Sequence, residues 1–140
     1  MNHDYLLRIL WTVAIIAAGI TFYYLGNRWI LRRAGRQPQI ASFALQGKPT
    51  LVYFTTPTCA PCKTVQRPAI ERLQQIAGDR LQVIEIDAAA QPEIARQWGV
   101  LSVPTTFVLD AAGHPQHVNH GVAPVDKLLK ELESCDDFSI

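Results

Sequence analysis

The chain has 140 residues, of which 49% are hydrophobic, and a formal net charge of +1 at pH 7. This length suits one domain and a short additional segment. The sequence has no internal repeat or low-complexity tract, and its basic residues are not interleaved with aromatic ones in a base-stacking pattern, so nucleic-acid binding is not predicted. From Gln37 onward 8 basic residues accompany 11 acidic ones, which gives that part a net charge of −3.

The first predicted element is a transmembrane helix over residues 9–27, preceded by an N-terminal flank, residues 1–8. No residue from 9 to 27 is charged, and a helix of this length spans about 28 Å, close to the hydrocarbon thickness of a bilayer. The ends carry aromatic residues suited to membrane interfaces, namely Trp11, Tyr23, Tyr24 and Trp29. A buried core helix and a cleaved signal peptide are alternatives, but the chain lacks the basic start and small-residue cleavage site of a signal peptide.

Residues 28–42 form a basic juxtamembrane linker, which sets the expected orientation. Arginines follow the apolar run at positions 28, 32, 33 and 36, whereas Arg8 alone precedes it and is offset by Asp4. The positive-inside rule therefore predicts a single-pass membrane protein whose soluble domain lies on the cytoplasmic side. In the alternative, the domain is extracytoplasmic and the arginines lie on anionic headgroups.

A compact domain is predicted over residues 43–134, followed by an acidic tail, 135–140. The residue pattern predicts strands near 50–56, 81–87, 105–110 and 115–120 and helices over 60–77, 91–98 and 124–134. The segment before Thr50 is too short for a strand plus a full helix, so at most a brief edge strand is expected near 39–43. Strand–helix–strand followed by a hairpin implies a mixed sheet with helices on both faces.

Cys59-Ala60-Pro61-Cys62 lies between the apolar run Leu51–Phe54 and the predicted helix. This places a dithiol at a helix N-terminus, where unpaired N–H groups and the helix dipole stabilise a thiolate. A thiolate attacks disulfides, and a second thiol three residues on can resolve the resulting mixed disulfide. A metal knuckle needs further ligands that the chain does not offer at suitable spacing, and a structural disulfide closing so small a loop would stabilise little.

A proline before a second apolar run, in Ser102-Val103-Pro104-Thr105-Thr106, is tolerated at a strand's first position, and its peptide bond can be cis. Together with the strand–dithiol–helix unit, this resembles the thioredoxin family from about Ala41 to Leu132. The resemblance implies an α/β thioredoxin-like fold, with a mixed central sheet flanked by helices, trimmed at its N-terminus and preceded by one transmembrane helix. It also implies that Cys59 is the nucleophile and Cys62 the resolving thiol, with Ala60 and Pro61 in the active-site loop. The substrate-binding residues would be Trp98, Val103, Pro104 and Thr105.

The function implied is a membrane-anchored thiol–disulfide oxidoreductase that reduces protein disulfides by dithiol exchange. Its partners would be disulfide-containing substrates, a recycling thiol reductase or electron donor, and membrane lipid around residues 9–27. Neither an organic cofactor nor a metal is expected. Three alternatives stay open. The first is an outward-facing reductase for envelope protein or cytochrome maturation, and the second is a non-catalytic tethered module that binds a partner through the Pro104 face. The third is a metal chaperone that binds copper or zinc through the reduced dithiol.

Several positions depart from the family pattern, and three of them concern the interior and the helix next to the dithiol. Tyr53 stands where thioredoxins usually carry a buried Asp that helps to deprotonate the resolving thiol, and Val83 replaces the accompanying Lys. Both changes predict an apolar interior behind the dithiol, in which Cys62 lacks a proton acceptor. Pro68 lies six residues after Cys62, one residue later than the proline that usually bends this helix.

The remaining candidates predict no further chemistry. The closely spaced histidines 114, 117 and 120 are interpreted as a solvated hairpin and not as a metal site. Asp87, at the end of a strand, is interpreted as a turn or helix cap. Cys135 lies in the acidic stretch 131–137, and we expect it to be an unreactive surface thiol because neighbouring carboxylates disfavour its thiolate.

Overall fold

The computed structural model describes residues 2–34 and 47–135 and comprises two units, Met1–Ile30 and Leu31–Ile140. Helix α1 (Asn2–Ala34) forms the first unit and continues four residues past its boundary at Ile30. The helical span Leu7–Arg32 is long and apolar enough to cross a membrane. Thr12 and Thr21 donate their hydroxyls to backbone carbonyls four residues earlier, at 2.8 Å, which satisfies these polar groups within the helix.

Helix α1 extends past both ends of the predicted span, so residues 28–34 of the predicted linker are helical. The sequence offers a physical reason, because no proline interrupts the chain before Pro38 and Leu and Arg favour helix. The predicted edge strand near 39–43 lies outside the described residues.

The second unit contains a four-stranded sheet. Its strands are β1 (Thr50–Thr55), β2 (Gln82–Asp87), β3 (Thr105–Leu109) and β4 (Pro115–His120). The strand order is β2-β1-β3-β4, with β1 parallel to β2 and antiparallel to β3, and β3 antiparallel to β4. The predicted mixed sheet is therefore confirmed. All of β1 is buried, as expected of a central strand that is apolar along its length.

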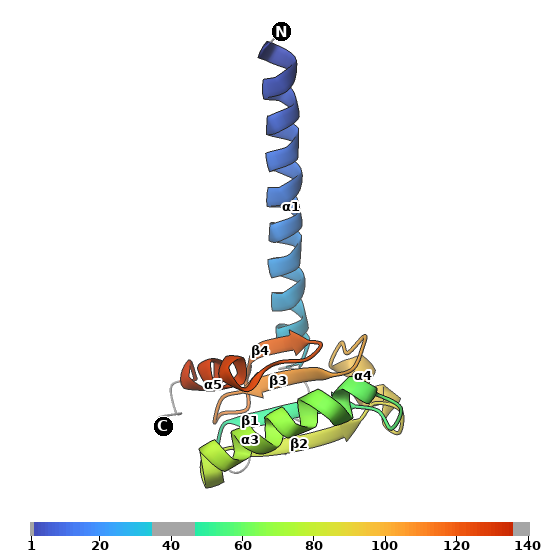
Figure 1. The fold of residues 1–140 in the computed structure, drawn as a ribbon, viewed down its shortest axis with the longest axis vertical. Helices are drawn as coiled ribbons and strands as arrows, with labels where there is room; N and C mark the ends of the chain where they lie inside the picture. Colours follow the sequence, from blue (N-terminus) through green and yellow to red (C-terminus); the bar gives the residue numbers. More distant parts are fainter. Residues whose placement is uncertain (1, 35–46, 136–140) are drawn as a thin grey trace. The chain divides into compact units, whose positions relative to one another are not determined.

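Helices α3 (Arg67–Ala77) and α5 (Val125–Glu133) pack together on one face of the sheet, which Figure 1 views from the front. Their buried leucines Leu73, Leu128 and Leu132 join Leu51 and Tyr53 of β1 in the core. A short turn, η3 (Gly78–Arg80), ends this helical segment.

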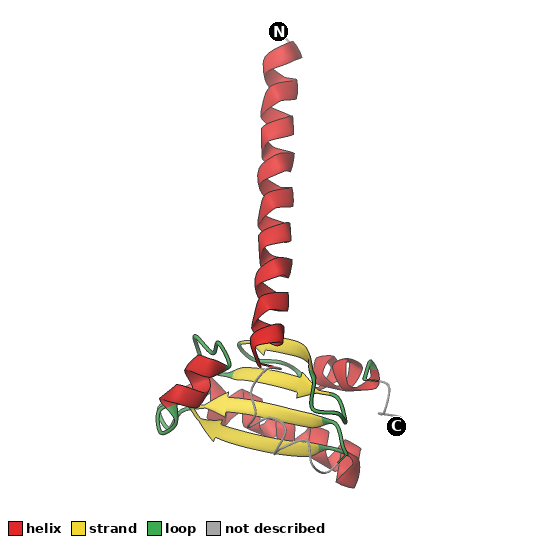
Figure 2. Cartoon of the chain, turned by 180° about the vertical axis from the view of Figure 1, so that it is seen from behind, coloured by secondary structure: helices red, strands yellow, loops and turns green. Residues whose placement is uncertain are grey.

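Figure 2 shows the opposite face of the sheet. This face carries an aromatic cluster. Helix α4 (Pro92–Gln97) leads directly to Trp98, whose ring lies 5.6 Å from that of Phe54 and 5.0 Å from that of Phe107. Since Phe54 alternates with Tyr53 along β1, the two core layers lie on opposite sides of the sheet. β1 thus connects both layers and ends directly before the dithiol loop.

Candidate redox site

Cys59 and Cys62 form a disulfide, with their Cα atoms 5.3 Å apart. The pair lies where the chain leaves β1 and enters a helix that begins at Ala60. The backbone N–H of Cys62 points at the Cys59 sulfur, with an N–S distance of 3.3 Å. Cys59 is 8% exposed and Cys62 only 1%. Solvent therefore reaches Cys59 more readily, and a helix N–H is in place to stabilise its thiolate after reduction.

The two residues between the cysteines, Ala60 and Pro61, are both exposed. Pro61 has φ −64° and ψ −26°, which are helical values that its ring favours in a first helical turn. These residues form the outer edge of the loop that the disulfide closes.

A π-turn, η2 (Cys62–Gln66), follows the dithiol. In it, the Arg67 N–H donates to the Cys62 carbonyl five residues earlier, instead of the four usual in an α-helix. This turn holds one extra residue, which accounts for the position of Pro68 six residues after Cys62. The displaced proline is visible in the sequence, but the π-turn was not predicted from it.

The Val103–Pro104 peptide bond is cis. The Pro104 carbonyl accepts a hydrogen bond from the Gly121 N–H at 2.8 Å, and Gly121 has φ +90°, a conformation that favours glycine. The Thr105 hydroxyl donates to the Ser102 carbonyl at 2.7 Å. Within residues 2–34 and 47–135, neither backbone group of Val103 has a backbone hydrogen-bond partner. Val103 is therefore able to pair with an extended peptide.

Gln66 is a functional candidate that the sequence analysis missed. Its side chain is fully buried, its amide NH₂ donates to the Ala123 carbonyl at 3.2 Å, and its amide oxygen accepts from the Ala123 N–H at 2.7 Å. This pair of bonds ties the active-site helix to the loop that contains Gly121. The only available signal was a glutamine two residues before the displaced Pro68, which is too little to predict that its side chain is buried in the core.

We expect Gln66→Ala to lower the free energy of unfolding by about 2–4 kcal/mol, because it leaves a cavity and two unpaired backbone groups at Ala123. Urea unfolding of the full chain in detergent measures this loss. Gln75→Ala, at an exposed position of α3, is the matched control and should change stability by less than about 0.5 kcal/mol. Equal stabilities of the two variants would contradict the structural role of the amide.

Tyr53 lies directly behind the dithiol and is 1% exposed. Its hydroxyl donates to the Cys62 carbonyl at 3.2 Å. Burial, the main cause, raises the pKa of Tyr53 above 10.0, and the Glu85 carboxylate raises it further, while a hydrogen bond with Thr55 and the charge of Arg67 act in the opposite direction. Tyr53 is therefore a neutral donor at physiological pH.

The Tyr53 hydroxyl is a buried polar group in the region behind the dithiol that was predicted to be apolar. Beside Tyr53 is a cavity of about 310 Å³, lined also by Val83 and by Arg67, Glu71 and Glu85. Arg67 and Glu85 form an ion pair at 2.6 Å, with about half of each side chain exposed. The charged side chains come from α3 and β2 and are exposed, so they line an open pocket at the surface and do not fill the interior.

The raised pKa of Tyr53 predicts a loss of stability in alkali. Unfolded Tyr53 releases its proton near 10.0, but the folded protein retains it. The stabilisation is therefore complete below that pH and is lost as pH rises toward the folded pKa. In this window the wild type should lose about 1.4 kcal/mol per pH unit more than Tyr53→Phe. Urea unfolding of both proteins at several pH values tests this, and parallel stability curves would contradict it.

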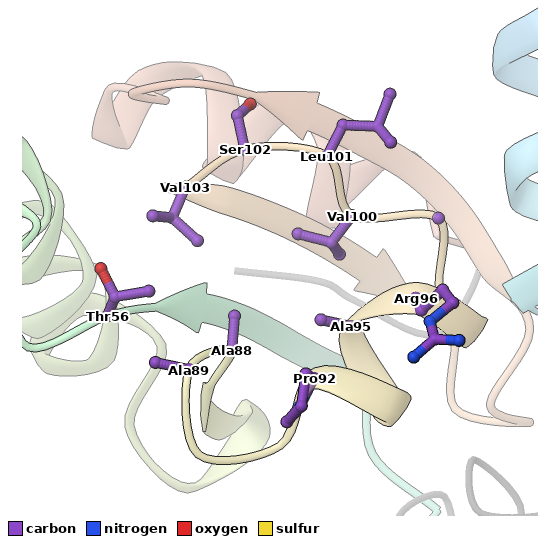
Figure 3. A pocket seen from close by; sticks show the side chains of 11 residues that line it. Thr56, Ala88, Ala89, Pro92, Ala95, Arg96, Val100, Leu101, Ser102 and Val103 are labelled. Atoms are coloured by element: carbon purple, nitrogen blue, oxygen red, sulfur yellow. The ribbon is translucent and has the colours of Figure 1, made fainter.

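A pocket of about 390 Å³ adjoins the cis-proline loop (Figure 3). Thr56 and Val103 line its side nearer the dithiol, and small apolar side chains form much of the remaining wall: Ala88, Ala89, Pro92, Ala95 and Val100. Leu101, on the same loop, is 91% exposed. The pocket can accept an apolar side chain close to the redox site.

Pro104 and Thr105, the first residue of β3, are both buried. Val103, which precedes them, is half-buried. Trp98, in contrast, is fully buried among aromatic rings. It therefore has no exposed surface with which to contact a partner directly and instead supports the adjoining loop from within the core.

Two of the weaker candidates have structural contacts. Asp87 accepts the N–H groups of Ala89 and Ala90 at 2.8 and 3.2 Å, so the prediction of a turn is confirmed. The prediction of a surface Cys135 is wrong, because this residue is 3% exposed and its thiol donates to the Glu131 carbonyl at 3.4 Å.

The histidines of the β3–β4 hairpin contact different side chains and do not converge on one site. His117 hydrogen-bonds Ser134 at 2.8 Å, and His114 lies 3.5 Å from the Asp110 carboxylate. In the part of the chain that the structure describes, no group of three His, Cys, Asp or Glu side chains is arranged to hold a metal.

A mixed sheet with a disulfide at the start of a helix and a cis-proline loop defines a redox protein with the thioredoxin-like fold. Residues 37–134 match the thioredoxin family model, which is more than half of the chain. The chain therefore belongs to the thioredoxin family, whose general chemistry is thiol–disulfide exchange.

The relatives agree with this assignment. The chain is 36% identical to a thioredoxin-like protein of Synechocystis over 68% of its own length and 92% of that protein's. It is 42% identical to a Bacillus subtilis thioredoxin over 42% of its length and 32% identical to chloroplastic thioredoxin Y of Oryza sativa over 63%. The last two matches span only 56% and 51% of those relatives.

Solved structures match the fold. Chloroplastic thioredoxin z superposes with a TM-score of 0.63 at 21% identity, covering 75% of this chain and 92% of that one. A thioredoxin variant of Halobacterium salinarum gives 0.62 at 24% identity, covering 74% and 88%. At such identities the match establishes the fold alone.

Proposed function

We propose that this protein is a membrane-anchored thiol–disulfide oxidoreductase that reduces disulfides in proteins. The observation that carries the proposal is the Cys59–Cys62 pair at a helix N-terminus, with the Cys62 N–H directed at the more accessible sulfur. A cysteine so placed forms a stabilised, reactive thiolate once it is reduced.

The reaction begins with the reduced pair. The Cys59 thiolate attacks one sulfur of a substrate disulfide, and the other substrate sulfur leaves as a thiolate that takes a proton from water. The Cys62 thiolate then attacks the Cys59 sulfur and releases the second substrate thiol. Two electrons pass to the substrate, and the pair ends as the disulfide described above. A recycling thiol reductase or other two-electron donor restores the dithiol.

Substrate would bind beside the cis-proline loop. The unpaired backbone groups of Val103 suit strand-like pairing with an extended substrate segment, and the proline that follows has no N–H to compete. The adjoining apolar pocket and exposed Leu101 offer a place for a substrate side chain. This favours protein disulfides over small, highly charged ones.

The anchor would be α1. Its span Leu7–Arg32 is long and apolar enough to cross a membrane, and by the positive-inside rule its arginines at positions 28, 32 and 33 favour a cytoplasmic domain. An outward-facing domain that maintains envelope thiols is the alternative location.

Reduction of insulin by the purified full chain in detergent, with dithiothreitol as electron source, tests the proposed function. Wild type should accelerate precipitation of the insulin B chain well above the dithiothreitol background, and Cys59→Ser should not. A wild-type rate equal to the background would overturn the assignment as a protein-disulfide reductase.

A further inference from the structure

Two donors converge on the backbone carbonyl of the resolving cysteine. The Cys62 oxygen accepts the Arg67 N–H that closes the π-turn and the Tyr53 hydroxyl at 3.2 Å. A carbonyl oxygen has two lone pairs, so both acceptor sites are occupied. One donor belongs to the same helix, whereas the other comes from the central strand.

The strand donor is rigidly held. Tyr53 is 1% exposed, and all of β1 around it is buried. Three charged side chains, Arg67, Glu71 and Glu85, share the cavity beside its ring. The hydroxyl is thus a fixed, neutral hydrogen-bond donor aimed at the start of the π-turn.

We propose that Tyr53 is a positioning residue for Cys62, and that its hydroxyl holds the π-turn so that the Cys62 thiol reaches the Cys59 sulfur in the second step of exchange. This inference rests on the proposed function, and it concerns the rate of one step. In that step the Cys62 thiolate bonds to the Cys59 sulfur, the bond from Cys59 to the substrate breaks, and the substrate sulfur leaves with the electron pair.

The π-turn explains why such a donor is needed. Its hydrogen bonds span five residues, which is a wider and less common arrangement than the α-helical turn. Without Tyr53, the Cys62 carbonyl would lose its hydrogen bond to the central strand and would retain the Arg67 N–H of its own helix. An intramolecular attack is fast only when the reacting atoms are held close and aligned, so looser anchoring should slow resolution and leave the first attack by Cys59 unchanged.

Single-turnover reaction with dithiobis(nitrobenzoate) separates the two steps, because each releases one coloured thiolate. The full chain is reduced, freed of reductant and mixed with the probe in detergent, in a Cys135→Ala background so that only two thiols react. The first release reports attack by Cys59, and the second reports resolution by Cys62. Tyr53→Phe should slow the second phase by about fivefold, the effect of losing one ordinary hydrogen bond, and leave the first phase unchanged.

Thr64→Ala is the matched control, since it removes a side-chain hydrogen bond to the Ala60 carbonyl in the same segment but at an exposed position. Both of its phases should equal those of the wild type. Circular dichroism verifies that each variant is folded. A further readout is pH: from about pH 6 to about pH 9 the ratio of wild-type to Tyr53→Phe resolution rates should stay constant, because a neutral tyrosine donates throughout this range.

The outcomes separate this inference from the proposed function. A wild type without a second release would contradict dithiol exchange itself. A normal wild type with an unchanged Tyr53→Phe second phase, or with both phases slowed equally, would overturn the positioning role alone. A rate ratio that changes between about pH 6 and about pH 9 would also overturn it, because it would indicate proton transfer by Tyr53.

Discussion

Cys62→Ala is expected to abolish turnover and to accumulate substrate proteins joined to Cys59 by a disulfide. The first attack needs only Cys59, whose sulfur receives the backbone N–H of residue 62, and alanine retains that N–H. Release of substrate needs the second thiol, which alanine lacks. The mixed disulfide should therefore persist until an added thiol cleaves it.

Nonreducing electrophoresis of membranes that contain the variant measures this product as bands of higher mass that disappear on reduction. Cys59→Ser, Cys62→Ala is the matched control and should give none of them. If Cys62→Ala alone forms no such bands, the chain would act as a tethered binding module and not as a reductase.

Much of the fold could be predicted from the sequence because the relevant signals are local. The apolar run Leu51–Phe54 identifies the central strand, since a strand covered on both faces is apolar along its length. Helix from residue 60 to residue 77 was expected, and the structure has it in one continuous segment that ends at Gly78, where φ is +57°. The Cys-x-x-Cys spacing indicated a redox pair for the same reason, because Cys59 and Cys62 lie within four consecutive residues.

The features that escaped prediction depend on three-dimensional contacts. Gln66 is buried because the π-turn directs it toward Ala123, 57 residues away in the sequence. Cys135 lies in an acidic stretch, which suggested exposure, yet it continues the helical spacing of Leu128 and Leu132 and joins their core cluster. The acidic residues are neighbours of Cys135 only in the sequence. The helical spacing from Leu128 and Leu132 identifies its neighbours in the folded domain.

Charged substitutions within the apolar span of α1 are expected to abolish membrane attachment. Ile16→Arg combined with Ile20→Arg places two charges in the centre of the apolar span, where each costs about 2.5–3.5 kcal/mol on insertion. Both positions are exposed along α1, so neither change disturbs a packed core. We expect the variant to move from the membrane fraction to the soluble or aggregated fraction, as measured by ultracentrifugation and immunoblotting.

The matched control is Ile16→Leu combined with Ile20→Leu, which keeps the span apolar and should remain in membranes. An arginine variant that still resists alkaline carbonate extraction would contradict a spanning α1.

The side of the membrane on which the domain lies can be determined by labelling wild-type cells with a membrane-impermeant thiol reagent after mild reduction. Cys59 is the appropriate reporter because Cys135 is buried, and a cytoplasmic domain should remain unlabelled until lysis. Labelling of Cys59 in intact cells would place the domain outside and favour maintenance of envelope thiols, since the arginines would then lie against the outer headgroups.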